Sequence, residues 1–464
     1  MTTLFLPPPS LLPSAAASQL DVSNALPTYT RTTENDWDVP DPTQEHQFFL
    51  TLKKTGVRWL TLSLQSRATS ADNTPVFYQT GEIKGTVTME LDKEELMDDV
   101  TLSLYGRLTV YTRTATMPSN FLFMTRKLYS AVEDTTVPSI KRGRLRGTYK
   151  WPFSFHLPKG VNILMSSAVL GVDGEKERYR LPPTFSDEDA GVNIEYMLSF
   201  RANRGGFKPS SKLVVPFNYV PLARPGPASI LQQLAYQQNV PLVGPSGDPD
   251  AWRTLDPVTL EGTLFKTIAV SACFTLSLTK PLMYTRGAPL HIHLTVCSAN
   301  EQFLDLLSLD SLHVALVQEL HFGDNVAFWP RFSQRLAPQH FVKPYERARA
   351  TWWHDTLKMS ATTLTVASSV SAQQPPAFSE VDARNTRSFM GEMQVPGGLA
   401  PACEILHYSH KYHVALYPPD AVGFVPSTPR KKALVEEEVG IVTSFAQGPK
   451  PCSYLSPQYD APED

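Results

Sequence analysis

The sharpest chemical candidate in the sequence is a short peptide near its start, Leu26-Pro-Thr-Tyr29. It resembles the Leu-Pro-x-Tyr variant of a WW-docking motif: proline presets an extended polyproline II backbone, and the aromatic-lined groove of a WW domain accepts a proline and a tyrosine with little cost of ordering. We therefore predict that Leu26, Pro27 and Tyr29 form a WW-docking site. A chance match of four residues in a proline-rich segment is the alternative interpretation.

A second docking candidate lies near the end of the sequence, where Pro457 precedes Tyr459 by two residues. Ser456 stands where a docking motif of this kind has a proline or a leucine. We therefore predict that Pro457 and Tyr459 form the weaker of the two sites.

One stretch of the sequence carries four positive charges within six residues: Lys141, Arg142, Arg144 and Arg146. Arginine forks match phosphate groups, so this stretch is a possible contact for anionic lipid headgroups or for a phosphorylated peptide. An ordinary basic loop is the interpretation that we favour, because no second basic cluster is visibly linked to it.

Histidines occur at metal-like spacing in two places, but neither place predicts a metal site. On a strand, His407 and His413 would lie about 20 Å apart, which is too far for one zinc ion. His291 and His293 share a face but have no third ligand nearby in the sequence. We expect these histidines to face solvent.

Catalytic motifs are missing from the sequence. It holds no Gly-x-Ser-x-Gly, no phosphate-binding glycine loop and no kinase signature. We therefore predict no catalytic residue, no metal, no cofactor and no enzymatic activity.

The segments around these candidates alternate between apolar and polar residues with a period of two. Such alternation, with turn signals between the segments and almost no helical periodicity, indicates antiparallel sheets packed as β-sandwiches. The alternating segments are 59–64, 81–91, 100–106, 149–158, 192–200, 272–278, 290–296, 312–320 and 403–417.

Composition divides the sequence into five parts. Its ends are rich in Pro, Ser and charged residues, which predicts low order there, and a proline-rich stretch with one short helical candidate at 229–238 separates two strand-rich regions. The parts are a disordered arm at 1–44, a first lobe at 45–222 with a mobile surface loop at 159–180, a linker at 223–250, a second lobe at 251–420 and a flexible tail at 421–464.

Bulk composition excludes several classes of protein. The net charge of −3 does not favour nucleic-acid binding. The four cysteines are too few and too widely spaced for a disulfide scaffold, which favours a reducing compartment. No targeting segment stands out, and the apolar stretch at 267–279 is too short to span a bilayer as a helix. We expect a cytoplasmic protein with at most peripheral membrane contact.

An ordered set of these segments resembles the arrestin family, specifically its α-arrestin (arrestin-related trafficking adaptor) branch of fungal type. The segments that carry the resemblance are 78–91 with Gly81 and Gly85, 100–106, 149–158, 181–185, 194–201, 284–296 and 412–417 followed by Pro418-Pro419.

The resemblance implies an all-β fold of two arrestin-like, immunoglobulin-type β-sandwich lobes with disordered tails. It also implies an adaptor that links transporters or receptors to a WW-domain ubiquitin ligase, and so promotes their ubiquitination and endocytosis at the plasma membrane or endosomes. The family usually carries its docking motifs after the second lobe, whereas Leu26-Pro-Thr-Tyr29 precedes the first.

One other class stays open at the level of sequence, a structural sorting subunit of an endosomal coat with the same lobes and without ligase recruitment. An enzyme built on a β-sandwich would require clustered acids or a set of metal ligands, together with a signal peptide, and we find neither in the sequence.

Overall fold

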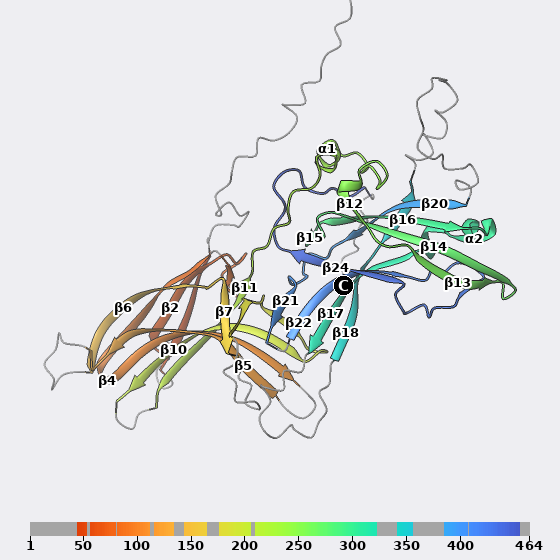
Figure 1. Cartoon of the computed structure of the whole chain (residues 1–464). Helices are drawn as coiled ribbons and strands as arrows, with labels where there is room; N and C mark the ends of the chain where they lie inside the picture. The colour runs from red at the N-terminus through yellow and green to blue at the C-terminus, as the bar shows by residue number, and fades with distance from the viewer. Residues whose placement is uncertain are drawn as a thin grey trace, which may run out of the picture. The chain divides into compact units, whose positions relative to one another are not determined.

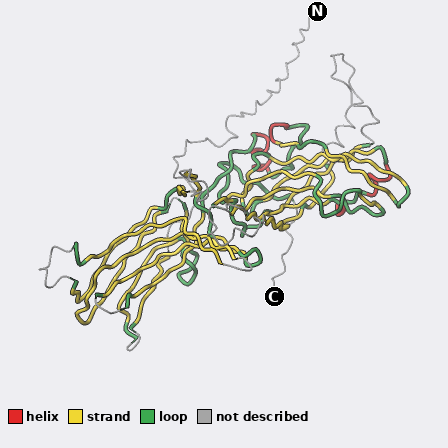
Figure 2. Tube along the Cα trace, turned by 60° about the horizontal axis from the view of Figure 1, so that its bottom comes forward, coloured by secondary structure: helices red, strands yellow, loops and turns green. Residues whose placement is uncertain are grey.

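The structure, a computed structural model, describes residues 44–454 with gaps at 53–55, 80, 112–115, 134–142, 165–175, 206–208, 323–340, 356–384 and 407. The described part is mostly strand (Figure 2). This confirms the predicted all-β fold of two sandwich lobes.

The first half of the chain forms one nine-stranded sheet that curls around a single core (Figure 1). Its hydrogen-bonded order is β1-β2-β4-β10-β11-β3, with β6 and β5 also paired to β4 and β9 paired to β10. The strands are β1 (Gln44–Thr51), β2 (Arg58–Ser66), β3 (Val76–Tyr78), β4 (Glu82–Tyr111), β5 (Thr116–Ser130), β6 (Arg144–His156), β9 (Phe185–Asp187), β10 (Val192–Arg204) and β11 (Ser211–Val220).

Strand β4 joins the two layers of this lobe. The alternation predicts two strands, at 81–91 and 100–106, but the structure makes them one strand of 30 residues. Its first part pairs with β2 and β6, and its second part with β10 and β5. The register shifts between Leu91 and Glu95, and such an irregularity allows one strand to bend from one layer into the other.

The second half of the chain packs two sheets face to face around its own core. The seven-stranded sheet holds β12 (Trp252–Thr254), β13 (Val258–Leu264), β14 (Ile268–Thr279), β16 (Pro289–Ser298), β19 (Thr351–His354), β20 (Thr386–Gln394) and β23 (Phe424–Pro426). The six-stranded sheet holds β15 (Met283–Thr285), β17 (His313–Phe322), β18 (Phe341–Arg349), β21 (Cys403–Ile405), β22 (Tyr408–Tyr417) and β24 (Val435–Val442).

Period-2 alternation explains the cores of both lobes. On β10, Ile194, Tyr196 and Leu198 are buried, whereas the residues between them are partly exposed. On β14, Ala272, Phe274 and Leu276 alternate in the same way. Burying each such aromatic or aliphatic side chain contributes about 1.5–3 kcal/mol, so the pattern fixes which face of each strand points inward.

The predicted helix of the linker is confirmed as α1 (Ile230–Gln238). Ser229 caps its first turn and forms a reciprocal capping box with Gln232. The helix ends at Asn239, which adopts a left-handed backbone with a φ of 52°. A second short helix, α2 (Glu301–Leu306), and two 3₁₀ turns, η3 (Pro249–Ala251) and η4 (Leu309–Ser311), complete the helical part of the described residues.

Two predictions of flexible segments, the tail at 421–464 and the surface loop at 159–180, are wrong. The tail predicted to be flexible from residue 421 instead contributes β23, paired with β13, and β24, paired with β22 and β15. Val439 and Ile441 of β24 are buried, which explains why this segment stays on the sheet. The surface loop predicted at 159–180 begins and ends as a hairpin of β7 (Gly160–Leu164) and β8 (Lys176–Arg180).

The helices of the described residues are short. None of them combines the length and the apolar character that a membrane-spanning helix requires.

Candidate interaction sites

Both predicted docking peptides lie outside the described residues. This holds for Leu26, Pro27 and Tyr29 before the first strand, and for Pro457 and Tyr459 after residue 454. Their role as docking sites stays a prediction.

The basic stretch is described only in part, because Lys141 and Arg142 also lie outside the described residues. Arg144 and Arg146 occupy the start of β6. The Arg144 guanidinium lies 2.7 Å from the Glu94 carboxylate across the β4–β6 pair, so part of its charge is already neutralised. Arg146 is exposed.

The expectation that the strand histidines face solvent is wrong for His291 and His293, which are buried, and His410 of β22 is buried as well. His413 is half-buried, and His407 lies outside the described residues. His291 and His293 point away from the core of the second lobe, as alternation requires, but another layer of chain covers that face.

This covering layer has two parts, the linker with α1 and a C-terminal strap, which we define as residues 443–454. The strap is tied down at both ends. The Thr443 hydroxyl donates to the Pro221 carbonyl at 2.9 Å, and the Tyr454 backbone N–H donates to the Glu392 carboxylate at 3.0 Å. Ser453 also donates its hydroxyl proton to Glu392. Sequence reasoning missed the strap because its residues carry no periodic pattern.

His291 lies at the centre of the covered face. Its Nε2 donates to the Cys452 carbonyl at 3.0 Å and lies 3.6 Å from the Glu392 carboxylate. The Tyr236 ring of α1 and the Tyr454 ring of the strap lie 5.9 Å and 5.1 Å from its ring. Burial lowers the pKa of His291 to about 4, so the imidazole is neutral at physiological pH.

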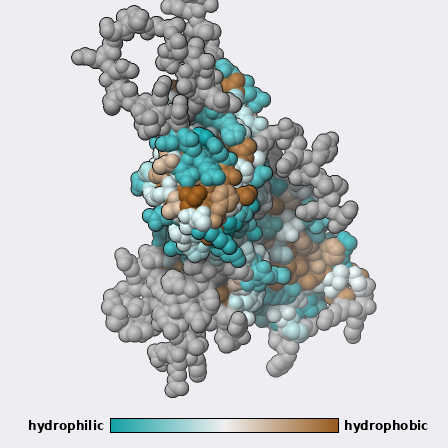
Figure 3. Space-filling view, turned by 90° about the vertical axis from the view of Figure 1, so that its right-hand side faces the viewer, coloured by the Kyte–Doolittle hydropathy of each residue, from teal (hydrophilic) through white to brown (hydrophobic). Residues whose placement is uncertain are grey.

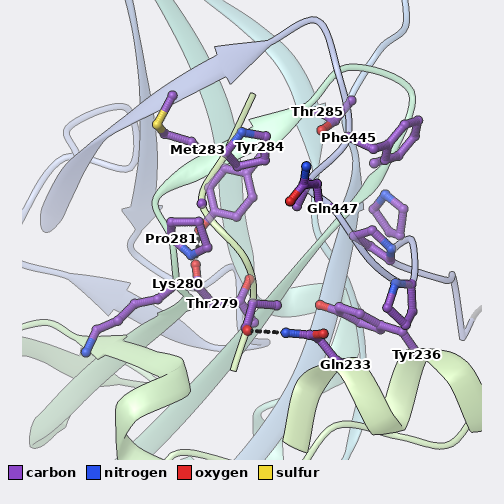
Figure 4. Close-up of a pocket in the computed structure, with 18 residues that line it drawn as sticks. Gln233, Tyr236, Thr279, Lys280, Pro281, Met283, Tyr284, Thr285, Phe445 and Gln447 are labelled. Atoms are coloured by element: carbon purple, nitrogen blue, oxygen red, sulfur yellow. Dashed lines mark hydrogen bonds between the residues drawn. The ribbon is translucent and has the colours of Figure 1, made fainter. Parts of the chain in front are cut away.

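A pocket opens where the strap passes the linker (Figure 4). Figure 4 shows Tyr236 and Gln233 entering from α1 on one side, Tyr284 from β15 and Phe445 from the strap on the others. The Tyr284 hydroxyl donates to the Thr279 carbonyl at 2.7 Å and is therefore occupied. The lining residues include Lys280 and the phenols of Tyr236 and Tyr284, but no carboxylate, histidine or cysteine side chain.

A polar cluster lies where the first lobe meets the second. The Tyr345 hydroxyl of β18 donates to the Asp187 carboxylate of β9 at 3.3 Å, and the Arg347 guanidinium lies 4.0 Å from the same carboxylate. Arg347 also donates to the Gln318 side-chain oxygen at 2.8 Å. The cluster joins strands from both lobes through charge-assisted hydrogen bonds.

Aromatic contacts extend this junction into the cores. The Phe185 ring lies 6.1 Å from Tyr408 and 5.2 Å from His410. Leu320, Ile405 and Tyr408 belong to the same apolar cluster as the core of the first lobe. Burial lowers the pKa of His410 to about 4 and raises the pKa of the Tyr408 phenol.

An exposed apolar group lies at the β13–β14 turn, where sequence analysis named no candidate. We call it the apolar tip and define it as Phe265, Ile268, Val422 and Val425, which are 48%, 41%, 74% and 51% exposed. Seen from the side of this turn, the molecule shows hydrophobic atoms surrounded by hydrophilic ones (Figure 3).

The backbone holds the tip in an unusual conformation. Phe265 and Lys266 both have left-handed backbones, with φ of 51° and 65°. The Phe265 N–H donates to the Gly423 carbonyl at 2.8 Å, and a Cβ atom at Gly423 would approach the Phe265 ring to 2.4 Å. A large apolar side chain in this conformation costs stability and usually has a functional reason.

Positive charge accompanies the apolar tip. Lys266 lies within the turn itself. Arg430 donates to the Phe424 carbonyl at 3.3 Å, which places the basic segment of Arg430, Lys431 and Lys432 beside the tip. Arg430 forms an ion pair with Asp420, whereas Lys431 and Lys432 are exposed.

Comparisons with protein-family models and with curated protein sequences find no match to this chain.

Proposed function

We propose that the protein is an arrestin-like adaptor that links membrane-protein cargo to a WW-domain ubiquitin ligase and so promotes ubiquitination and endocytosis of that cargo. The ligase docks on the peptide of Leu26, Pro27 and Tyr29, with Pro457 and Tyr459 as the weaker site. The adaptor thereby holds the ligase near the lysines of the cargo. This raises the effective concentration of the ligase there, so that docking motifs of low affinity are sufficient for ubiquitination.

The observation that carries the proposal is the apolar tip with its neighbouring lysines. An exposed group of large apolar side chains next to basic residues suits a surface that bears anionic lipids, because the apolar side chains bury in the headgroup region and the lysines attract the lipid charge. The membrane contact of the adaptor runs through this tip. In the basic stretch at 141–146, Arg144 is already paired with Glu94.

The docking peptides are tested by the binding of the full chain to purified WW domains of a Nedd4-type ligase. We expect Tyr29→Ala to weaken binding by about tenfold or more, because an aromatic anchor carries most of the affinity of such a short peptide. Tyr459→Ala is the matched control and should have a smaller effect. Failure of the wild-type chain to bind would reject the ligase role and favour the coat-type sorting scaffold.

The membrane contact is tested by sedimentation of the full chain with vesicles of phosphatidylcholine and phosphatidylserine. We expect Phe265→Asp to lower vesicle binding by about tenfold or more, because it removes an aromatic side chain that buries in the lipid headgroup region on binding and adds a negative charge. Aspartate tolerates a left-handed backbone better than phenylalanine does, so the variant should fold.

Val132→Asp serves as the control for this experiment. Val132 is 84% exposed and lies in the first lobe, far along the chain from the tip. If both variants bind vesicles like the wild type, the tip is not a membrane contact, and the WW-binding result is unaffected.

A further inference from the structure

Two of the four cysteines lie directly opposite each other on neighbouring strands. Strands β14 and β16 are antiparallel, and their register pairs Cys273 with Cys297. Opposite residues on one face of such a pair have Cβ atoms about 4.5–5.5 Å apart. Both cysteines are free thiols.

The pair lies on an accessible face. Cys273 and Cys297 share the outer face of the seven-stranded sheet with His291 and His293, but the linker and the strap cover only the histidine end. Cys297 is exposed and Cys273 is half-buried. The Cys297 thiol lies 3.3 Å from the Thr386 hydroxyl of β20.

The other two cysteines have different surroundings. Cys403 packs against the core of the first lobe, and burial raises the pKa of its thiol strongly. Cys452 belongs to the strap and contributes its carbonyl oxygen to His291. The pKa of the Cys273 thiol is also raised, first by burial and then by the Cys297 thiol.

We propose that Cys273 and Cys297 form a reversible cross-strand redox site, which a low-molecular-weight disulfide such as oxidised glutathione converts from two thiols to one disulfide.

The reaction is a pair of thiol–disulfide exchanges. The exposed Cys297 loses its proton to water, and its thiolate attacks one sulfur of oxidised glutathione; the glutathione S–S bond breaks and one glutathione thiolate leaves. The Cys273 thiolate then attacks the Cys297 sulfur of the mixed disulfide, and the second glutathione thiolate leaves. The protein loses two electrons and two protons, and one oxidised glutathione becomes two reduced molecules.

Geometry makes the bond reversible. An unstrained disulfide has Cβ atoms about 3.8 Å apart, which is closer than opposite positions on a flat strand pair. Closing the bond therefore pulls β14 and β16 together, and the strain makes the disulfide easier to reduce than a structural one. Because both strands are already paired in register, the oxidised chain keeps its fold.

The test uses the full chain, reduced and then incubated with oxidised glutathione, quenched in acid, alkylated and digested with trypsin. Arg286 lies between the two cysteines, so trypsin separates them onto different peptides. We expect the wild type to yield Cys273 and Cys297 peptides joined by a disulfide, with two hydrogen atoms lost and no glutathione retained on either. Dithiothreitol should restore both thiols.

Matched variants separate the two steps. Cys273→Ser should retain one glutathione on Cys297, since no resolving thiol remains, and Cys452→Ser should behave like the wild type. The proposal is overturned if wild-type Cys297 retains glutathione as Cys273→Ser does, if the disulfide forms only between chains in a concentration-dependent way, or if neither thiol reacts.

Discussion

Acidification from about pH 7 to about pH 4 is expected to lower the free energy of unfolding by roughly 6 kcal/mol, through two histidines that are buried in the neutral form. Burial lowers the pKa of both His291 and His410 to about 4. In the unfolded chain a histidine has a pKa of about 6.5. Each pKa unit corresponds to about 1.4 kcal/mol, which gives about 3 kcal/mol for each histidine.

The sign follows from proton binding. Between about pH 6.5 and pH 4 the unfolded chain has bound a proton on each histidine, whereas the folded chain has not. Lowering the pH therefore favours the unfolded state, and the stabilisation is fully present only above about pH 6.5. The loss is complete at about pH 4, where the folded histidines also become protonated.

The groups that face each histidine are consistent with a lowered pKa. His291 meets Glu392 of β20, but Ser453 and Tyr454 of the strap already bond that carboxylate. The ring also faces Tyr236 of α1 and the Cys452 carbonyl, neither of which carries charge.

Among the described residues, no carboxylate forms an ion pair with His410. It faces Phe185 of β9, the Cys403 thiol of β21, and Tyr408 and Tyr412 of its own strand. Burial is therefore the main cause of the lowered pKa at both histidines.

The measurement is urea unfolding of the full chain at a series of pH values. His291→Gln and His410→Gln should each flatten the pH dependence by about half, because each removes one titrating group while keeping a side chain that can donate a hydrogen bond. His156→Gln is the control, since the His156 side chain is 80% exposed. A wild-type stability that stays constant between about pH 6.5 and pH 4 would contradict the prediction.

The sequence predicts the strands of this protein well because alternation reports directly on a half-buried face. In β10, Val192, Ile194, Tyr196, Leu198 and Phe200 occupy alternate positions, and the structure places all five in the core. Alternation does not reveal that the predicted strands at 81–91 and 100–106 are one continuous strand. The pattern reports which face of a strand points inward, but the bend that carries a strand from one layer to the other has no apolar pattern of its own.

The functional surfaces were less predictable, and for a physical reason. Alternation assigns His291 and His293 to the face opposite the core, and only tertiary structure reveals that the strap and the linker cover this face. The apolar tip depends on Phe265 meeting Gly423, more than 150 residues further along the chain. Local periodicity predicts neither the covering of the histidine face nor the contact between Phe265 and Gly423.

Trp252→Ala is expected to destabilise the protein by about 3–5 kcal/mol and to detach the linker helix from the sheet. Trp252 is 2% exposed and lies between α1 and the outer face of the seven-stranded sheet, where it packs with Ala235, Leu242 and Met390. Its removal leaves a cavity that the rigid sheet cannot fill, and such truncations of large aromatic side chains cost this much.

The same substitution also removes a buried hydrogen bond, because the Trp252 indole N–H donates to the Val243 carbonyl at 2.8 Å. Trp252→Phe keeps most of the apolar volume and loses only this bond, so it should cost about 1–3 kcal/mol. Urea unfolding gives both values, and limited chymotrypsin digestion reports on the helix through cleavage at Tyr236, which packs against the same cluster. We expect fast cleavage in Trp252→Ala and slow cleavage in Trp252→Phe and the wild type. Equal protection in all three would show that the linker is held on the sheet by contacts other than Trp252.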